Sequence, residues 1–83
     1  MVEAYIFINT SPGRLDNAAK HIYSLEGVQS VKAITGPYDA IVKAEASNND
    51  ELGQLVVSSI QKVDGVEKTL TCLVVDLISD IAA

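Results

Sequence analysis

The residues best suited to chemistry form a short segment, Thr35-Gly36-Pro37-Tyr38-Asp39, between two runs in which apolar residues alternate. Gly36 permits backbone angles and close approaches that other residues forbid, while Pro37 fixes one dihedral angle and has no N–H to donate. Tyr38 and Asp39 add an aromatic face, a hydroxyl and a carboxylate. A turn with these groups can hold a small polar molecule. The alternative is a tight hairpin with a solvated acid, because Gly-Pro is ordinary turn punctuation.

The other reactive side chains are too few and too scattered for a catalytic or metal site. His21 is the single histidine and falls beside the apolar stripe of its predicted helix, so we expect it to be solvated. Cys72 is the single cysteine, which excludes an intramolecular disulfide, and its apolar run predicts a small buried thiol in the core. We therefore predict no catalytic residue, no metal, no cofactor and no enzymatic activity.

Length and composition predict one domain over residues 1–83, of a size at which a monomer is marginal and oligomerisation helps. The apolar residues come in short blocks, well below the roughly 18 consecutive residues of a membrane span. The net charge is −5 and the six basic residues are spread singly, which argues against a nucleic-acid surface. No basic stretch precedes an apolar core at the N-terminus, so we expect a cytoplasmic protein with no targeting signal.

Four strands are predicted over residues 4–9, 28–35, 38–46 and 66–75. Between the first two, Ser11 is a candidate cap followed by Pro12, a residue suited to the first helical position. The helix that follows ends at Gly27, and its core stripe consists of Leu15, Ala18, Ala19, Ile22 and Leu25.

A second helix is predicted between the third and fourth strands. Asn48 with Glu51, or Ser47 with Asp50, forms a signal like a capping box at its start. Its predicted stripe is Leu52, Leu55, Val56, Ser59 and Val63. The resulting order is β-α-β-β-α-β.

The two halves of the chain echo each other. Leu25-Glu26-Gly27-Val28 and Val63-Asp64-Gly65-Val66 occupy equivalent places, each a helix end followed by glycine and a strand. A duplicated βαβ unit would show this repeat. The predicted fold class is α+β, a ferredoxin-like βαββαβ sandwich with a four-stranded antiparallel sheet and both helices on one face.

Both faces of the predicted sheet are largely apolar. In the first strand, one face carries Ala4, Ile6 and Ile8, and the other carries Tyr5 and Phe7. In the fourth strand, Leu70, Cys72 and Val74 oppose Thr69, Thr71, Leu73 and Val75. Two helices cover only one face, so the other would expose more apolar surface than a monomer usually does. The simplest partner is a second copy, which predicts a homodimer that forms through the sheet.

With these elements in place, the sequence resembles a known family. It is similar to the effector-binding domain of Lrp/AsnC transcription regulators, the RAM domain, in its stand-alone form. The resemblance covers about residues 2–76 and rests on two motifs read together, Gly-x-Tyr-Asp at 36–39 and Gly-Val-x-x-Thr-x-Thr at 65–71.

The resemblance implies an assembly and a site. In this family the sheets pair into dimers, dimers form rings that are commonly octamers, and small effectors such as amino acids bind between dimers. It implies that Gly36, Tyr38 and Asp39 line the effector site, with hydroxyls from Thr69 and Thr71 on a neighbouring surface. Asp39 would pair with an α-ammonium group, while turn amides and threonine hydroxyls would donate to the carboxylate. The alternative for the threonines is ordinary strand propensity.

One departure from the family shapes the functional prediction. Full-length members carry an N-terminal helix-turn-helix domain, whereas we expect this chain to be the stand-alone form without one, and so we expect no DNA contact by that route. We predict a domain that senses an amino acid or similar zwitterion, oligomerises, and acts on transcription through a partner such as a full-length Lrp/AsnC regulator. The alternatives are a small dimeric ferredoxin-like enzyme and a purely structural assembly module. The tail, residues 77–83, is apolar enough to pack on the assembly.

Overall fold

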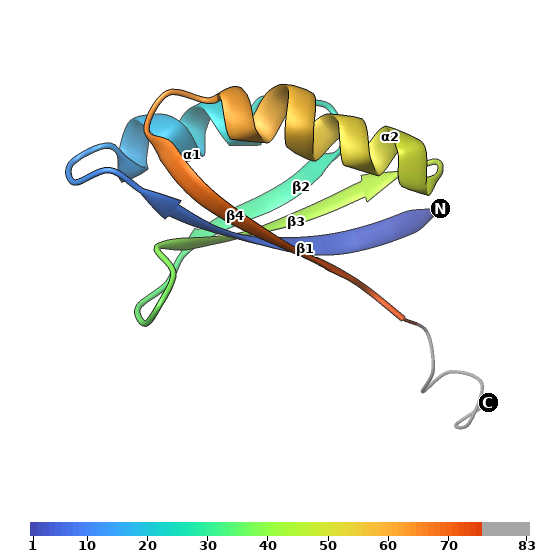
Figure 1. Cartoon of the computed structure of the whole chain (residues 1–83), viewed down its shortest axis with the longest axis horizontal. Helices are drawn as coiled ribbons and strands as arrows, with labels where there is room; N and C mark the ends of the chain where they lie inside the picture. The colour runs from blue at the N-terminus through green and yellow to red at the C-terminus, as the bar shows by residue number, and fades with distance from the viewer. Residues whose placement is uncertain (76–83) are drawn as a thin grey trace.

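The computed structural model describes residues 1–75, and it shows one sheet with two helical segments across one of its faces (Figure 1). The strands are β1 (Val2–Thr10), β2 (Val28–Ala33), β3 (Ala40–Ala46) and β4 (Val66–Leu73). The first helix is α1 (Leu15–Tyr23). The second helical segment begins as α2 (Asn49–Gln54) and continues through a π-helical turn (Leu55–Ser59) and a 3₁₀ turn (Ile60–Lys62). The predicted tail lies outside the described residues.

The sheet has the order β2-β3-β1-β4, and its three strand pairs are all antiparallel. Ile6 of β1 lies opposite Val42 of β3 on one side and Thr71 of β4 on the other. The predicted α+β ferredoxin-like fold is confirmed. No helix within residues 1–75 has both the length and the hydropathy needed to cross a membrane.

The core lies between the helices and the sheet face that they cover. The two central strands contribute short aliphatic side chains at every second position, because successive residues of a strand point to opposite faces. Its members, all at most 5% exposed, are Ala4, Ile6, Ile8, Ala18, Ile22, Ala40, Val42, Ala44, Leu52, Val56, Ile60 and Val63.

The two halves of the chain make equivalent backbone contacts, as expected of a duplicated unit. The N–H of Glu45, at the end of β3, donates to the carbonyl of Gly27 over 2.8 Å. The N–H of Ser11, just after β1, donates to the carbonyl of Gly65 over the same distance. Both glycines follow a helix and have nearly the same positive φ, 96° and 97°. Each glycine therefore joins one half of the fold to the other.

The start of α1 differs from the prediction. The helix begins at Leu15 with Arg14 at the N-cap, and no side chain of the described residues caps it. Ser11 instead donates its hydroxyl to Glu67 Oε2 over 3.2 Å, which ties the β1–α1 turn to β4. Gly13, with φ of 78°, turns the chain between Ser11 and the helix.

The predicted cap of the second helix is confirmed in its first form. Asn48 Oδ1 accepts a hydrogen bond from the N–H of Glu51 over 2.8 Å. Glu51 Oε2 in turn accepts from the N–H of Ser47 over 3.3 Å. The two side chains thus satisfy two backbone N–H groups at the first turn, those of Glu51 and Ser47.

The core stripe of the second helix also differs from the prediction, which included Ser59 and omitted Ile60. Ile60 is fully buried, while Ser59 is only half-buried. The π turn explains the change. It adds one residue to the helix, which turns every later side chain back by about 100° relative to a regular helix with 3.6 residues per turn. Ile60 therefore takes the core position that Ser59 would have occupied.

The position of Cys72 corrects a further prediction. Cys72 is exposed, because it lies opposite Tyr5 on the sheet face away from the helices. The apolar run around Cys72 has residues on both faces of β4. Only the odd-numbered residues of this run point to the helices. We call the uncovered surface the open face. It is defined by Tyr5, Phe7, Ile41, Leu70 and Cys72.

Candidate functional site

The loop at 34–39 is longer than predicted, because β2 ends at Ala33 and β3 begins at Ala40. It projects from the sheet away from the helices (Figure 1). Two backbone bonds close it: the N–H of Ile34 donates to the carbonyl of Asp39 over 3.0 Å, and the N–H of Asp39 donates to the carbonyl of Ile8 over 2.9 Å. The amide of Asn9 also donates to the carbonyl of Pro37 over 3.0 Å. Several contacts with β1 thus hold the loop in place.

The Asp39 carboxylate has a structural partner. Its Oδ2 accepts from the N–H of Thr10 over 2.7 Å and lies 3.5 Å from the Thr10 hydroxyl. Thr10 lies two residues beyond Ile8, the last residue of β1 that pairs with β3, so its N–H is available to the carboxylate. Among residues 1–75, only Oδ2 of this carboxylate is engaged by a hydrogen bond. Oδ1 retains its capacity to accept from a bound group.

Gly36 and Tyr38 occupy different parts of this loop. Gly36 is exposed at the tip with φ of 129°, and no atom of its non-adjacent neighbours in residues 1–75 lies within 4 Å of the place where a Cβ would stand. Tyr38 is half-buried, and its ring lies 5.3 Å from the ring of Phe7. Tyr38 therefore borders the open face.

Thr69 and Thr71 lie on the opposite, helix-covered face of the sheet. In the β1–β4 register they pair with Ile8 and Ile6. Together with the second helical segment they line a hollow of about 420 Å³ at the sheet edge, which we call the edge groove. Its lining comprises Asn49, Leu52, Gly53, Val56, Val57, Gln61, Thr69, Thr71 and Leu73.

The five predicted site residues thus form two groups within one chain. Gly36, Tyr38 and Asp39 share the loop, whereas the two threonines share the edge groove. The groups lie on opposite sides of β1, about 10 Å apart across two strand spacings. Gln61 was not among the residues predicted from the sequence, yet its Nε2 donates to Thr69 Oγ1 over 2.9 Å. Regular helical periodicity turns that residue elsewhere, so the sequence contains no simple signal for it.

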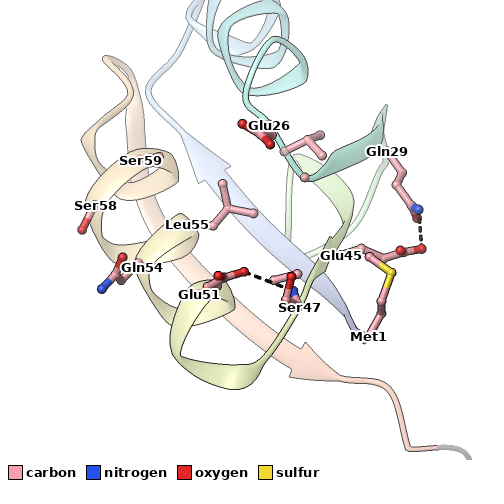
Figure 2. Close-up of a pocket in the computed structure, with 13 residues that line it drawn as sticks. Met1, Glu26, Gln29, Glu45, Ser47, Glu51, Gln54, Leu55, Ser58 and Ser59 are labelled. Atoms are coloured by element: carbon pink, nitrogen blue, oxygen red, sulfur yellow. Dashed lines mark hydrogen bonds between the residues drawn. The ribbon is translucent and has the colours of Figure 1, made fainter.

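A second hollow, which the sequence did not predict, lies between the α1–β2 loop, the end of β3 and the second helical segment (Figure 2). Among the residues that the structure describes, its lining includes three carboxylates, from Glu26, Glu45 and Glu51, and no lysine or arginine. Figure 2 shows Glu45 bonded to Gln29 and Glu51 bonded to Ser47. We call this hollow the acidic cleft. Its charge disfavours a negatively charged ligand.

The described residues offer no centre for metal chemistry. Within residues 1–75, no cluster of three or more histidine, cysteine, aspartate or glutamate side chains is arranged to hold a metal ion. The chemistry available at the loop and the edge groove is hydrogen bonding and ion pairing.

Comparison with known proteins identifies the family of this fold and site. The model of the Lrp/AsnC ligand binding domain matches residues 3–81. The chain belongs to this family. The predicted resemblance is therefore confirmed, and the chain is a ligand-binding domain of a kind found in transcriptional regulators.

Two curated relatives place this domain in different proteins. The chain is 43% identical over 58 residues, 70% of its length, to 12% of a homocitrate synthase of Sulfolobus acidocaldarius. It is 32% identical over 62 residues, 75% of its length, to 41% of an uncharacterized HTH-type transcriptional regulator of Pyrococcus abyssi. The chain thus spans less than half of the length of either relative.

Solved structures share the fold over nearly the whole chain. TTHA0845 from Thermus thermophilus is 31% identical and has a TM-score of 0.86, over 90% of this chain and 94% of that one. NMB0573 from Neisseria meningitidis was solved as a complex with L-Met; it is 19% identical with a TM-score of 0.84, over 93% of this chain and 51% of that one. The second likeness shows the fold alone.

Proposed function

We propose that this chain is a non-enzymatic sensing domain that binds an amino acid or a similar small zwitterion and relays that binding through its oligomeric state. The observation that carries the proposal is the pair of relatives, an HTH-type regulator and a homocitrate synthase. DNA binding and catalysis require different chemistry, so this domain would not supply the chemistry of both. A ligand-dependent change in assembly is useful to both.

The ligand chemistry follows from the two groups of site residues. Asp39 Oδ1 receives an α-ammonium group, and the Thr69 and Thr71 hydroxyls donate to a carboxylate. The groups are separated within one chain, so the ligand lies where the loop of one subunit meets the edge groove of another. Gly36 and Tyr38 shape the loop side of this site. NMB0573 with its L-Met makes amino acids the first class of ligand to test.

The assembly begins with a homodimer through the open face. Tyr5 and Leu70 are 38% and 46% exposed there, beside the exposed Cys72. A second copy buries this surface about a two-fold axis. Higher rings, with an octamer as the expected form, then bring loops and edge grooves together. Full-length Lrp/AsnC regulators are the expected partners in transcription regulation, because they carry the same domain.

A structural assembly module is the second candidate. The hydrogen bond between Thr10 and Asp39 favours this candidate, because it gives the carboxylate of the loop a role in the fold. Such a module binds no metabolite.

A thermal-shift screen against the twenty common amino acids, with light scattering on each hit, separates the two candidates. A ligand at a hundred times its Kd stabilises the folded state by about 2.7 kcal/mol. For a domain of this size that raises Tm by about 10 °C or more. Absence of any shift in an assembled protein would favour the structural module.

Two substitutions of Asp39 separate its structural role from its binding role. In Asp39→Asn the amide oxygen still accepts from Thr10, so we expect a loss of stability of at most about 1 kcal/mol. The ammonium contact loses its charge, and amino-acid affinity should fall by about tenfold or more. In Asp39→Ala the Thr10 N–H loses its partner, which costs about 1–3 kcal/mol of unfolding free energy. Urea denaturation and calorimetric titration measure the two effects, and unchanged affinity in Asp39→Asn would refute the ammonium contact.

A further inference from the structure

The edge groove owes its polar chemistry to the π turn at Leu55–Ser59. The extra residue of this turn rotates the later side chains by about 100°. The same rotation that buries Ile60 also brings Gln61 over β4, where its amide reaches Thr69. A regular helix would direct Gln61 to a different side.

The bond between Gln61 and Thr69 determines what the threonine offers to a ligand. Gln61 Nε2 donates and Thr69 Oγ1 accepts over 2.9 Å. A hydroxyl has one hydrogen to donate. While its oxygen accepts from Gln61, the Thr69 hydroxyl still has this hydrogen to donate to an acceptor in the groove.

The rest of the groove fits an acceptor attached to an apolar group. Thr71 lies two residues along the same face of β4, about 6.6 Å away by strand rise, and adds a second hydroxyl. Val57 and Leu73 contribute apolar wall, at 58% and 51% exposure. Among residues 1–75, no aspartate or glutamate lines the edge groove, whereas three glutamates line the acidic cleft on the other side of the same helical segment. Of these two hollows, the edge groove is the one that accommodates an anion.

We propose that the edge groove binds the carboxylate end of a small molecule with an apolar chain, and that Gln61 is a specificity-determining residue of this groove. Gln61 acts by positioning the Thr69 hydroxyl as a donor. This inference rests on the proposed function for the role of Thr69, and it extends that function to a residue outside the family motifs quoted above.

The test compares two glutamate substitutions on the same helical segment. In Gln61→Glu the new carboxylate accepts from Thr69 and repels an anion in the groove. In Gln54→Glu the same change is made at an exposed residue that lines the acidic cleft. The probes are L-methionine, L-methioninamide and 4-(methylthio)butanoic acid, with the matching three forms of L-leucine, each titrated calorimetrically into the full chain. The two amides lack the carboxylate. The two acids without an α-amino group, 4-(methylthio)butanoic acid and its leucine counterpart, lack the ammonium group.

We expect Gln61→Glu to weaken binding of the carboxylate probes at least tenfold, and to reduce the preference for acid over amide by the same factor. Gln54→Glu should change neither quantity by more than twofold. A merely structural role of Gln61 would weaken acid and amide alike, and that result would overturn the inference.

The remaining outcomes separate this inference from the proposed function. If the amino acids bind and Gln61→Glu leaves their affinity unchanged, the inference fails and amino-acid sensing stands. If only the acids without an ammonium group bind, and Gln61→Glu weakens them, the groove assignment stands and amino-acid sensing fails. If none of the six probes binds the unsubstituted protein, the inference is overturned.

Discussion

Replacing Leu70 with glutamate is expected to convert the proposed dimer of this chain into monomers. Leu70 lies opposite Phe7 in the β1–β4 register, where the edge strand β4 contributes to the open face. In a two-fold interface each substitution is present twice, and each buried carboxylate costs several kcal/mol when no partner pairs with it. We expect the dimer Kd to rise by about a thousandfold or more, which corresponds to roughly 4 kcal/mol. Light scattering over a concentration series measures the change.

The matched control for Leu70→Glu is Tyr23→Glu. Tyr23 is 63% exposed and lies at the end of α1, in the layer that covers the other face of the sheet. The Tyr23→Glu substitution places the same charge at an exposed position away from the open face. The control should keep the mass of the unsubstituted protein. Equal dimerisation of the two variants would show that the open face is not the interface.

Alanine at Gly27 is expected to cost more stability than alanine at a glycine with open space around it, because a methyl group there adds a close contact to the backbone strain. Gly27 has φ of 96°, and a Cβ there would stand 2.8 Å from the Glu45 carbonyl oxygen. The left-handed backbone costs about 1–2 kcal/mol for an alanine. The forced shift of a backbone oxygen adds about 1–3 kcal/mol. The sum is a large share of the roughly 5–15 kcal/mol of unfolding free energy typical of a domain.

Gly13→Ala isolates the first of these two costs. Gly13 also has a positive φ, 78°, but no atom lies within 4 Å of its added Cβ. We expect it to lose about 1 kcal/mol, from backbone strain alone. Urea denaturation of both variants measures the difference. Equal losses would mean that the close approach of Gly27 to Glu45 contributes nothing to the stability of the fold.

The fold was predictable from sequence because its signals are local and periodic. Alternation along the strands identified both sheet faces, and the repeated glycines at 27 and 65 identified the duplicated unit. The cap at Asn48 was also predictable, because the capping residue and its partner are three residues apart. Ser11 was misassigned because its partners, Gly65 and Glu67, are more than fifty residues away.

The candidate site was predictable only in part. The motif residues Gly36, Tyr38 and Asp39 do share one loop, and Thr69 and Thr71 do share one face of β4. The bond from Thr10 to Asp39 was not predictable, because it joins two residues that are 29 positions apart in the sequence. The exposed position of Cys72 depends in the same way on which face of β4 meets the helices.

The sequence by itself determined the class of fold, the apolar character of both sheet faces, the family, and the residue types available for binding. Tertiary structure alone decided how those residues are used. Local patterns record the spacing of side chains along one element, whereas the contact between Gln61 and Thr69 depends on an extra residue in one helix and on the strand beneath it. Packing between different elements therefore decided which groups surround each hydroxyl, and no local pattern records that.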